Sequence, residues 1–98
     1  NAVQIKPSAE GGFLVSGALT FETVPSVVRS STALLNGGAD IIFDLQGISN
    51  ADSAGLALLI EWMRAAHAQQ KRIIFKNIPA QLLAIATMSG VEHILPTV

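Results

Sequence analysis

The sequence lacks several residue types on which whole classes of protein depend. It contains no cysteine, which excludes a disulfide scaffold and thiolate chemistry and is compatible with the cytosol. With only two histidines, it also offers few ligands for a metal, and we expect no metal site. Charged residues make up 13% of the chain, the net charge is −1, and the largest basic cluster is Lys71-Arg72, so we expect no nucleic-acid partner.

Sequence signals that extend over several residues are missing as well. No apolar run approaches the roughly 20 residues of a membrane span, so we expect no direct membrane insertion. The first residues show no secretory-signal pattern, and we interpret Asn1-Ala2 as residues left from expression because no Met precedes them. Without a glycine-rich loop that ends in Lys and Ser or Thr, we expect no nucleotide site of that kind and no cofactor.

Hydrophobic residues, in contrast, are abundant: they form 50% of the 98 residues. A chain of this length has room for one core, so we predict a single domain over residues 1–98. The apolar content has two interpretations, a compact core under a thin polar shell or an apolar surface that a partner covers. Composition leaves both open.

Hydrophobic periodicity predicts an alternation of strands and helices. The predicted strands lie at residues 3–6, 13–19, 40–45 and 73–75, the first two forming a hairpin through a turn at Glu10-Gly11-Gly12. The predicted helices lie at residues 24–35, ended by Gly37-Gly38, at 53–70, and at 79–88, before a short tail. The strand at 40–45 is apolar on both faces, as helix-covered parallel strands are. We therefore predict an α/β fold, a small mixed β-sheet with a starting hairpin and helices packed against it.

The helix after Ser53 carries two apolar stripes. The first is predicted to face the sheet and consists of Leu56, Leu59, Ile60 and Met63. The second consists of Leu58, Trp62 and Ala65. It either packs on a neighbouring helix or exposes Trp62 or Leu58 as an anchor for another protein.

A polar turn before this helix presents Asp52 and Ser53 at the helix start, where unpaired N–H groups favour a hydroxyl or a phosphate. Serine at such a position is most often a cap, and Asp52 is the alternative cap. The other interpretation is a regulatory or interface role for Ser53. Catalysis would require a base beside the hydroxyl. The only bases near Ser53 in the sequence are Asp44 and Asp52, and His67 and His93 are both far along the chain, so we do not expect an enzyme.

Asp44-Leu45 followed by Asp52-Ser53-Ala54-Gly55-Leu56 and an apolar helix resembles the signature of STAS domains. The chain is similar to the STAS subunit of the Mla phospholipid-transport system in several places: at residues 20–25, at residues 54–59 followed by Glu61-Trp62, and in the ending that comprises Ile78-Pro79 and residues 89–96. The resemblance implies a STAS-like (SpoIIAA-like) fold. It also implies a partner, the ATPase of an Mla-type ABC complex, which a non-catalytic cytoplasmic subunit would bind and stabilise at the inner membrane.

The same resemblance implies a site. Ser53 would be the regulatory residue and the phosphorylation candidate, with Asp52 and Asp44 beside it. Further implied interface residues are Ala54, Gly55, Leu58 and Trp62. The alternative function is an anti-sigma-factor antagonist that is switched by phosphorylation of Ser53, with an anti-sigma factor and a kinase as partners. A third hypothesis, a module that binds a small apolar ligand, depends only on the high apolar content.

Overall fold

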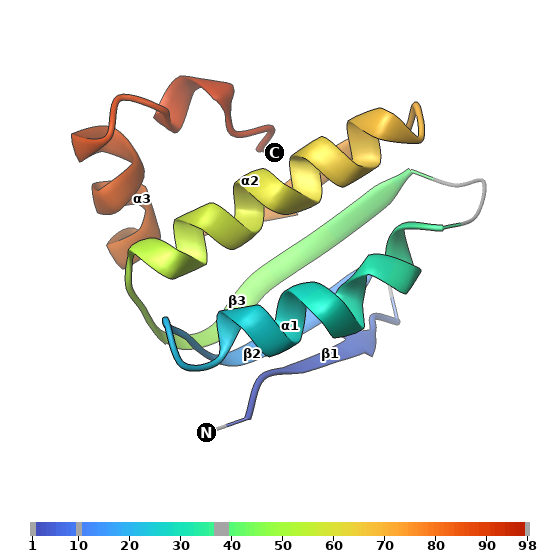
Figure 1. Ribbon diagram of the computed structural model, residues 1–98, viewed down its shortest axis with the longest axis horizontal. Coiled ribbons are helices and arrows are strands. Elements are labelled where there is room, and N and C mark those ends of the chain that lie inside the picture. The colour runs from blue at the N-terminus through green and yellow to red at the C-terminus, as the bar shows by residue number, and fades with distance from the viewer. Residues whose placement is uncertain (1, 10, 37–39, 98) are drawn as a thin grey trace.

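The computed structural model describes residues 2–9, 11–36 and 40–97, which form one sheet with helices packed on it (Figure 1). The strands are β1 (Gln4–Pro7), β2 (Phe13–Leu19), β3 (Ile41–Ala51) and β4 (Ile73–Lys76). The helices are α1 (Val24–Ser31), α2 (Ser53–Ala68) and α3 (Ala80–Met88), with short 3-10 helices η1 (Thr32–Leu35) and η2 (Glu92–Ile94). The predictions for Asn1, Glu10 and Gly37-Gly38 fall outside the described residues.

The strands follow one another across the sheet in the order β1-β2-β3-β4. β1 and β2 pair antiparallel, which confirms the predicted hairpin, and β3 and β4 continue the sheet in parallel. Beyond β4, the Phe75 N–H donates to the Pro96 carbonyl at 2.8 Å, and Thr97 forms a bridge with Phe75. The C-terminal segment therefore lies along the β4 edge, whereas β1 forms the other edge.

β3 differs from the prediction in its length and its surroundings. It continues to Ala51, because β2 pairs with it as far as Leu19. Alternate residues in its first half are buried, but Ile42 and Asp44, on the opposite face, are only half-buried. The expectation that helices cover both faces is wrong: α1 and α2 both lie in front of the sheet (Figure 1). Because the strand order advances in one direction, right-handed crossovers place both helices on the same face.

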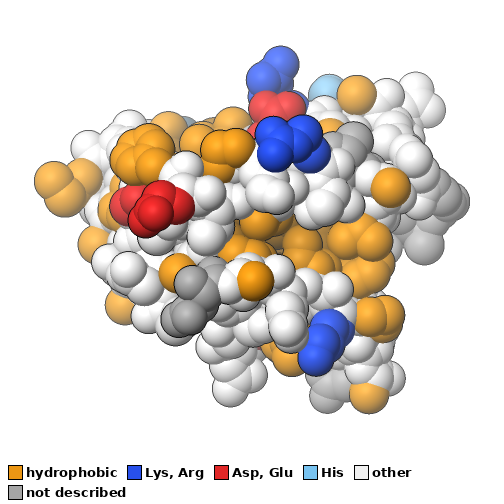
Figure 2. All heavy atoms as spheres, turned by 60° about the horizontal axis from the view of Figure 1, so that its bottom comes forward, with side chains coloured by type: hydrophobic (Ala, Val, Ile, Leu, Met, Phe, Trp, Pro, Cys, Tyr) orange, Lys and Arg blue, Asp and Glu red, His pale blue; other side chains and the backbone are white. Residues whose placement is uncertain are grey.

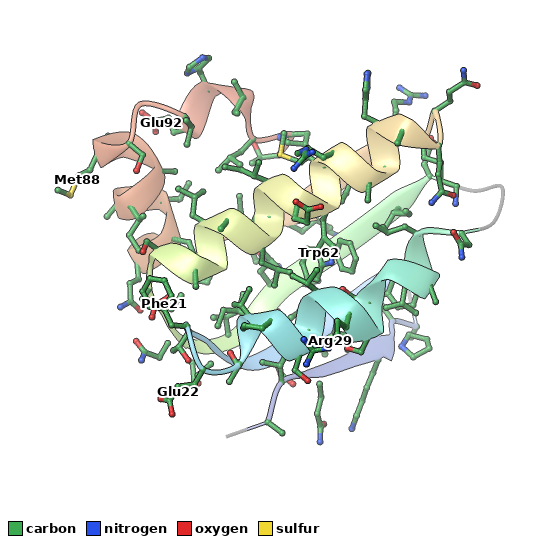
Figure 3. All side chains as sticks on the ribbon, in the orientation of Figure 1. Phe21, Glu22, Arg29, Trp62, Met88 and Glu92 are labelled. Carbon is green, nitrogen blue, oxygen red and sulfur yellow. The ribbon has the colours of Figure 1, made fainter. Side chains whose placement is uncertain are left out.

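Trp62 lies at the centre of the core, between α1, α2 and the sheet (Figure 3). Its side chain is 2% exposed, and its ring stacks on Phe43 with centroids 4.1 Å apart. The indole N–H donates to Ser31 Oγ at 2.8 Å, and the Ser31 hydroxyl donates in turn to the Val27 carbonyl. Leu58 is fully buried as well. The interface role expected for Trp62 and Leu58 is therefore wrong. The alternative, that they pack on a neighbouring helix, is correct.

The burial of Trp62 also decides how α2 is rotated on the sheet. The buried residues of α2 are Ala54, Gly55, Leu56, Leu58, Leu59, Trp62 and Ala66. Ile60 and Met63, which were predicted to face the sheet, are only half-buried and line a surface groove instead. Leu56 and Leu59 of the first stripe are buried as predicted, and Leu58 and Trp62 of the second stripe are buried with them.

The edge of the sheet at β1 is open. Hydrophobic side chains gather there in a hollow between β1 and α1 (Figure 2). It has a volume of ≈ 230 Å³ and is lined by Val3, Ile5, Val27, Ser30 and Leu34. Among the described helices, none is long and apolar enough to cross a membrane.

Candidate functional site

Asp52 joins three segments at the start of α2. One carboxylate oxygen accepts the N–H of Ala54 at 2.8 Å and so caps the helix, and the other accepts the N–H of Phe21 at 3.2 Å. The Asp52 N–H donates to the Leu19 carbonyl at 3.1 Å. The carboxylate therefore holds the turn after β2 against the first turn of α2, and of the two candidate caps Asp52 is the one used.

Ser53, by contrast, is exposed, and its hydroxyl makes no hydrogen bond within the described part of the chain. It stands at the first position of a 16-residue helix, where backbone N–H groups and the helix dipole favour negative charge. The side chain is thus open to a partner or to a modifying enzyme, and capping does not account for its presence.

Replacing Asp52 tests this description of the turn. We expect Asp52→Ala to lower the free energy of unfolding by about 1–2 kcal/mol, because the cap and the bond to the loop are both lost. Asp52→Asn should cost less, since its amide oxygen still caps the helix. Chemical denaturation of the two variants measures the difference. An Asn variant as unstable as the Ala variant would contradict the assignment of the cap.

The surface around Ser53 combines exposed apolar side chains with two carboxylates, those of Asp52 and Glu22 (Figure 3). Phe21, 69% exposed, projects from the turn that Asp52 holds, and Met88, 89% exposed, lies at the far end of α3 (Figure 3). α3 contains no charged residue, and Gln81 at its start accepts the N–H of Ala51 at 3.1 Å, which fixes α3 beside the start of α2. Ala57, one turn after Ser53, is exposed too. Large exposed apolar side chains beside a helix without charges are suited to contact with another protein.

Sequence reasoning missed Phe21 and Gln81. Phe21 lies 31 positions before Asp52 and Gln81 lies 30 positions after Ala51, and the fold brings each pair into hydrogen-bond contact. A phenylalanine between Thr20 and Glu22, in a polar turn, was the one available signal.

Ala54 and Gly55, which were expected at the interface, are buried beneath it. An ideal Cβ at Gly55 would lie 3.1 Å from a methyl carbon of Leu82 and 3.2 Å from Leu19 Cβ. The glycine therefore allows α2 to approach β2 and α3 closely. Its role, like that of Ala54, is to support the site from within, and the expectation of direct contact is wrong.

Asp44 is not beside Ser53 either. It precedes Ala51 by seven residues of β3, which at about 3.3 Å per residue places it roughly 20 Å away. Its carboxylate accepts the Asn77 side-chain amide and the Gln46 N–H, each at 3.0 Å. The bond from Asn77 holds the pKa of Asp44 below its ordinary value, helped by Gln46 and by the charge of Lys76. Asp44 belongs to the junction of β3 with the loop after β4.

His67 lies at the opposite end of α2 from Ser53, about 21 Å away at 1.5 Å per residue. His67 is therefore too far from the Ser53 hydroxyl to act as its base. His93 belongs to η2. Among the described residues, no group of three or more His, Cys, Asp or Glu side chains is arranged to hold a metal ion.

Comparison with known proteins gives one family and one fold. The family model described as "Mlab, STAS domain" matches residues 5–96. The anti-sigma factor antagonist SpoIIAA, in its unphosphorylated form, superposes with a TM-score of 0.69 at 22% identity, over 99% of this chain and 87% of that one. An anti-sigma-factor antagonist (STAS) domain protein from Planctomyces limnophilus gives 0.74 at 13% identity, over 99% and 89%. Among curated proteins, no sequence matches significantly.

Proposed function

We propose that this chain, which belongs to the family of Mlab-type STAS domains, is a non-catalytic subunit that binds the ATPase of an Mla-type lipid-transport ABC complex. STAS domains in general act through contacts with other proteins. The partner and the location, at the cytoplasmic face of the inner membrane, are our proposal for this chain.

The observation that carries the proposal is the surface around Ser53. It combines an exposed hydroxyl at a helix start, an exposed aromatic side chain at Phe21 and a neighbouring helix without charges. Large exposed apolar side chains that surround a polar group are typical of protein contacts, in which a few aromatic residues carry most of the binding energy. The carboxylate next to Ser53, that of Asp52, is engaged by the N–H groups of Ala54 and Phe21, which favours binding over catalysis.

Co-purification tests the proposal. The tagged chain is isolated from cells that express its whole operon, and its partners are identified by mass spectrometry. We expect recovery of an ABC ATPase in a stable complex. Recovery of the chain alone, with an ATPase that is stable and fully active without it, would count against the proposal.

The surface is tested with a matched pair of variants. Phe21→Ala should weaken ATPase binding by about 2 kcal/mol or more, as truncation of a central interface aromatic does. Ile94→Ala, at a residue that is 45% exposed on η2, removes another large apolar side chain away from the site and should leave binding unchanged. If both variants lose the same amount of ATPase binding free energy, the contact with the ATPase lies elsewhere.

The exposed Ser53 hydroxyl also supports the alternative, an anti-sigma-factor antagonist switched by phosphorylation. That function requires a kinase to reach Ser53 and a phosphate to change partner binding.

A further inference from the structure

A second surface feature lies on another side of α2, between its C-terminal half, β4 and η2. It is a groove with a volume of ≈ 410 Å³. Its apolar lining consists of Ile60, Met63, Ile73 and Ile94. The volume lies within the range of small-molecule sites, about 300–1,000 Å³. The groove is separate from the Ser53 surface, so a ligand bound there would add to the proposed function.

The polar residues that line this groove are all basic. Arg64, His67 and Lys71 complete the lining, and no acidic residue belongs to it. Ile60, Met63, Arg64 and His67 are spaced i, i+3, i+4 and i+7, so they share one face of α2. Along that face the lining changes from apolar to basic toward the C-terminal end of the helix.

Two of these basic residues, Arg64 and His67, are not held by a strong internal partner within the described part of the chain. Arg64 pairs with Glu61 at 3.2 Å, but the two side chains are 75% and 47% exposed, and such surface pairs contribute little. His67 is exposed, whereas Lys71 donates to the Leu35 carbonyl. Arg64 and His67 are therefore available to an incoming anion at the end of the apolar groove.

We propose that this groove binds a single acyl chain that ends in an anionic group, a carboxylate or a phosphate. The chain contacts Ile60, Met63, Ile73 and Ile94, and the anionic group lies near Arg64 and His67. The apolar lining matches the acyl chain, and the basic side chains match the anionic group. A hydrogen bond to a charged group adds affinity that a neutral head group lacks.

The test uses dodecanoate, dodecyl phosphate and dodecanol, each below its aggregation limit, titrated into the full chain and followed by two-dimensional amide NMR. We expect saturable shifts confined to residues around the groove for at least one anionic probe, with affinity about tenfold higher than for dodecanol. The stronger of the two anionic probes identifies the head group. Equal affinity for dodecanol, or no saturable binding of either anion, would overturn the proposal.

Matched variants locate the binding. Met63→Glu should abolish it, whereas Met88→Glu, the same change on exposed α3, should not. Arg64→Gln with His67→Gln should weaken it about tenfold, whereas Arg29→Gln on α1 should leave it unchanged. The amide spectrum establishes that each variant is folded. If folded Met63→Glu binds normally, the proposal is wrong. If Met63→Glu no longer binds the ATPase and the wild-type chain binds no amphiphile, the groove is a protein contact and the proposal is wrong as well.

Discussion

Trp62→Ala is expected to lower the free energy of unfolding by about 3–5 kcal/mol, the range for truncating a large buried aromatic residue. Domains of this kind are stable by about 5–15 kcal/mol, so the variant should be close to unfolding at moderate temperature. The loss has two sources, the stacking on Phe43 and the hydrogen bond to Ser31. Denaturation followed by circular dichroism measures it, since the change removes the only tryptophan.

Two further variants separate these sources. Trp62→Phe keeps an aromatic ring against Phe43 and should cost less than Trp62→Ala. Ser31→Ala keeps the indole but leaves its buried N–H unpaired, which should cost about 1–3 kcal/mol. If Trp62→Ala unfolds like wild type and instead loses partner binding, the tryptophan is an interface residue and its placement in the core is incorrect.

Ser53→Glu is expected to keep the fold and to weaken ATPase binding by about a hundredfold or more, because a further negative charge enters the contact beside Asp52 and loses its hydration. The monomer should tolerate the change, since the side chain is exposed and the start of α2 favours negative charge. Denaturation should therefore differ from wild type by no more than about 0.5 kcal/mol. Binding to the purified ATPase, measured by calorimetry, gives the affinity.

Ser53→Thr is the matched control, because it keeps the hydroxyl and should bind normally. Mass spectrometry of the protein from cells grown under several conditions gives the natural state of Ser53, which we expect to be unphosphorylated. A large phosphorylated fraction, together with an ATPase complex that Ser53→Glu leaves intact, would support the anti-sigma-factor antagonist instead.

The sequence by itself determined the order of strands and helices, the starting hairpin and the helix start at Ser53. These features depend on local patterns: alternation in strands, helical spacing, and polar residues where a helix begins. The resemblance around Asp52 and Ser53 identified the family for the same reason, since its residues lie within one short stretch. The choice between Asp52 and Ser53 as cap remained open, because both residues have suitable side chains.

Only the tertiary structure decided which surfaces are free. Both apolar stripes of α2 contribute buried residues, and Trp62 is one of them because Phe43 and Ser31, 19 and 31 positions away, contact it in the core. The long β3 separates Asp44 from Ser53, whereas Asp52 brings Phe21 to the site. These outcomes depend on contacts between residues distant in the chain, and local periodicity contains no information about such pairs.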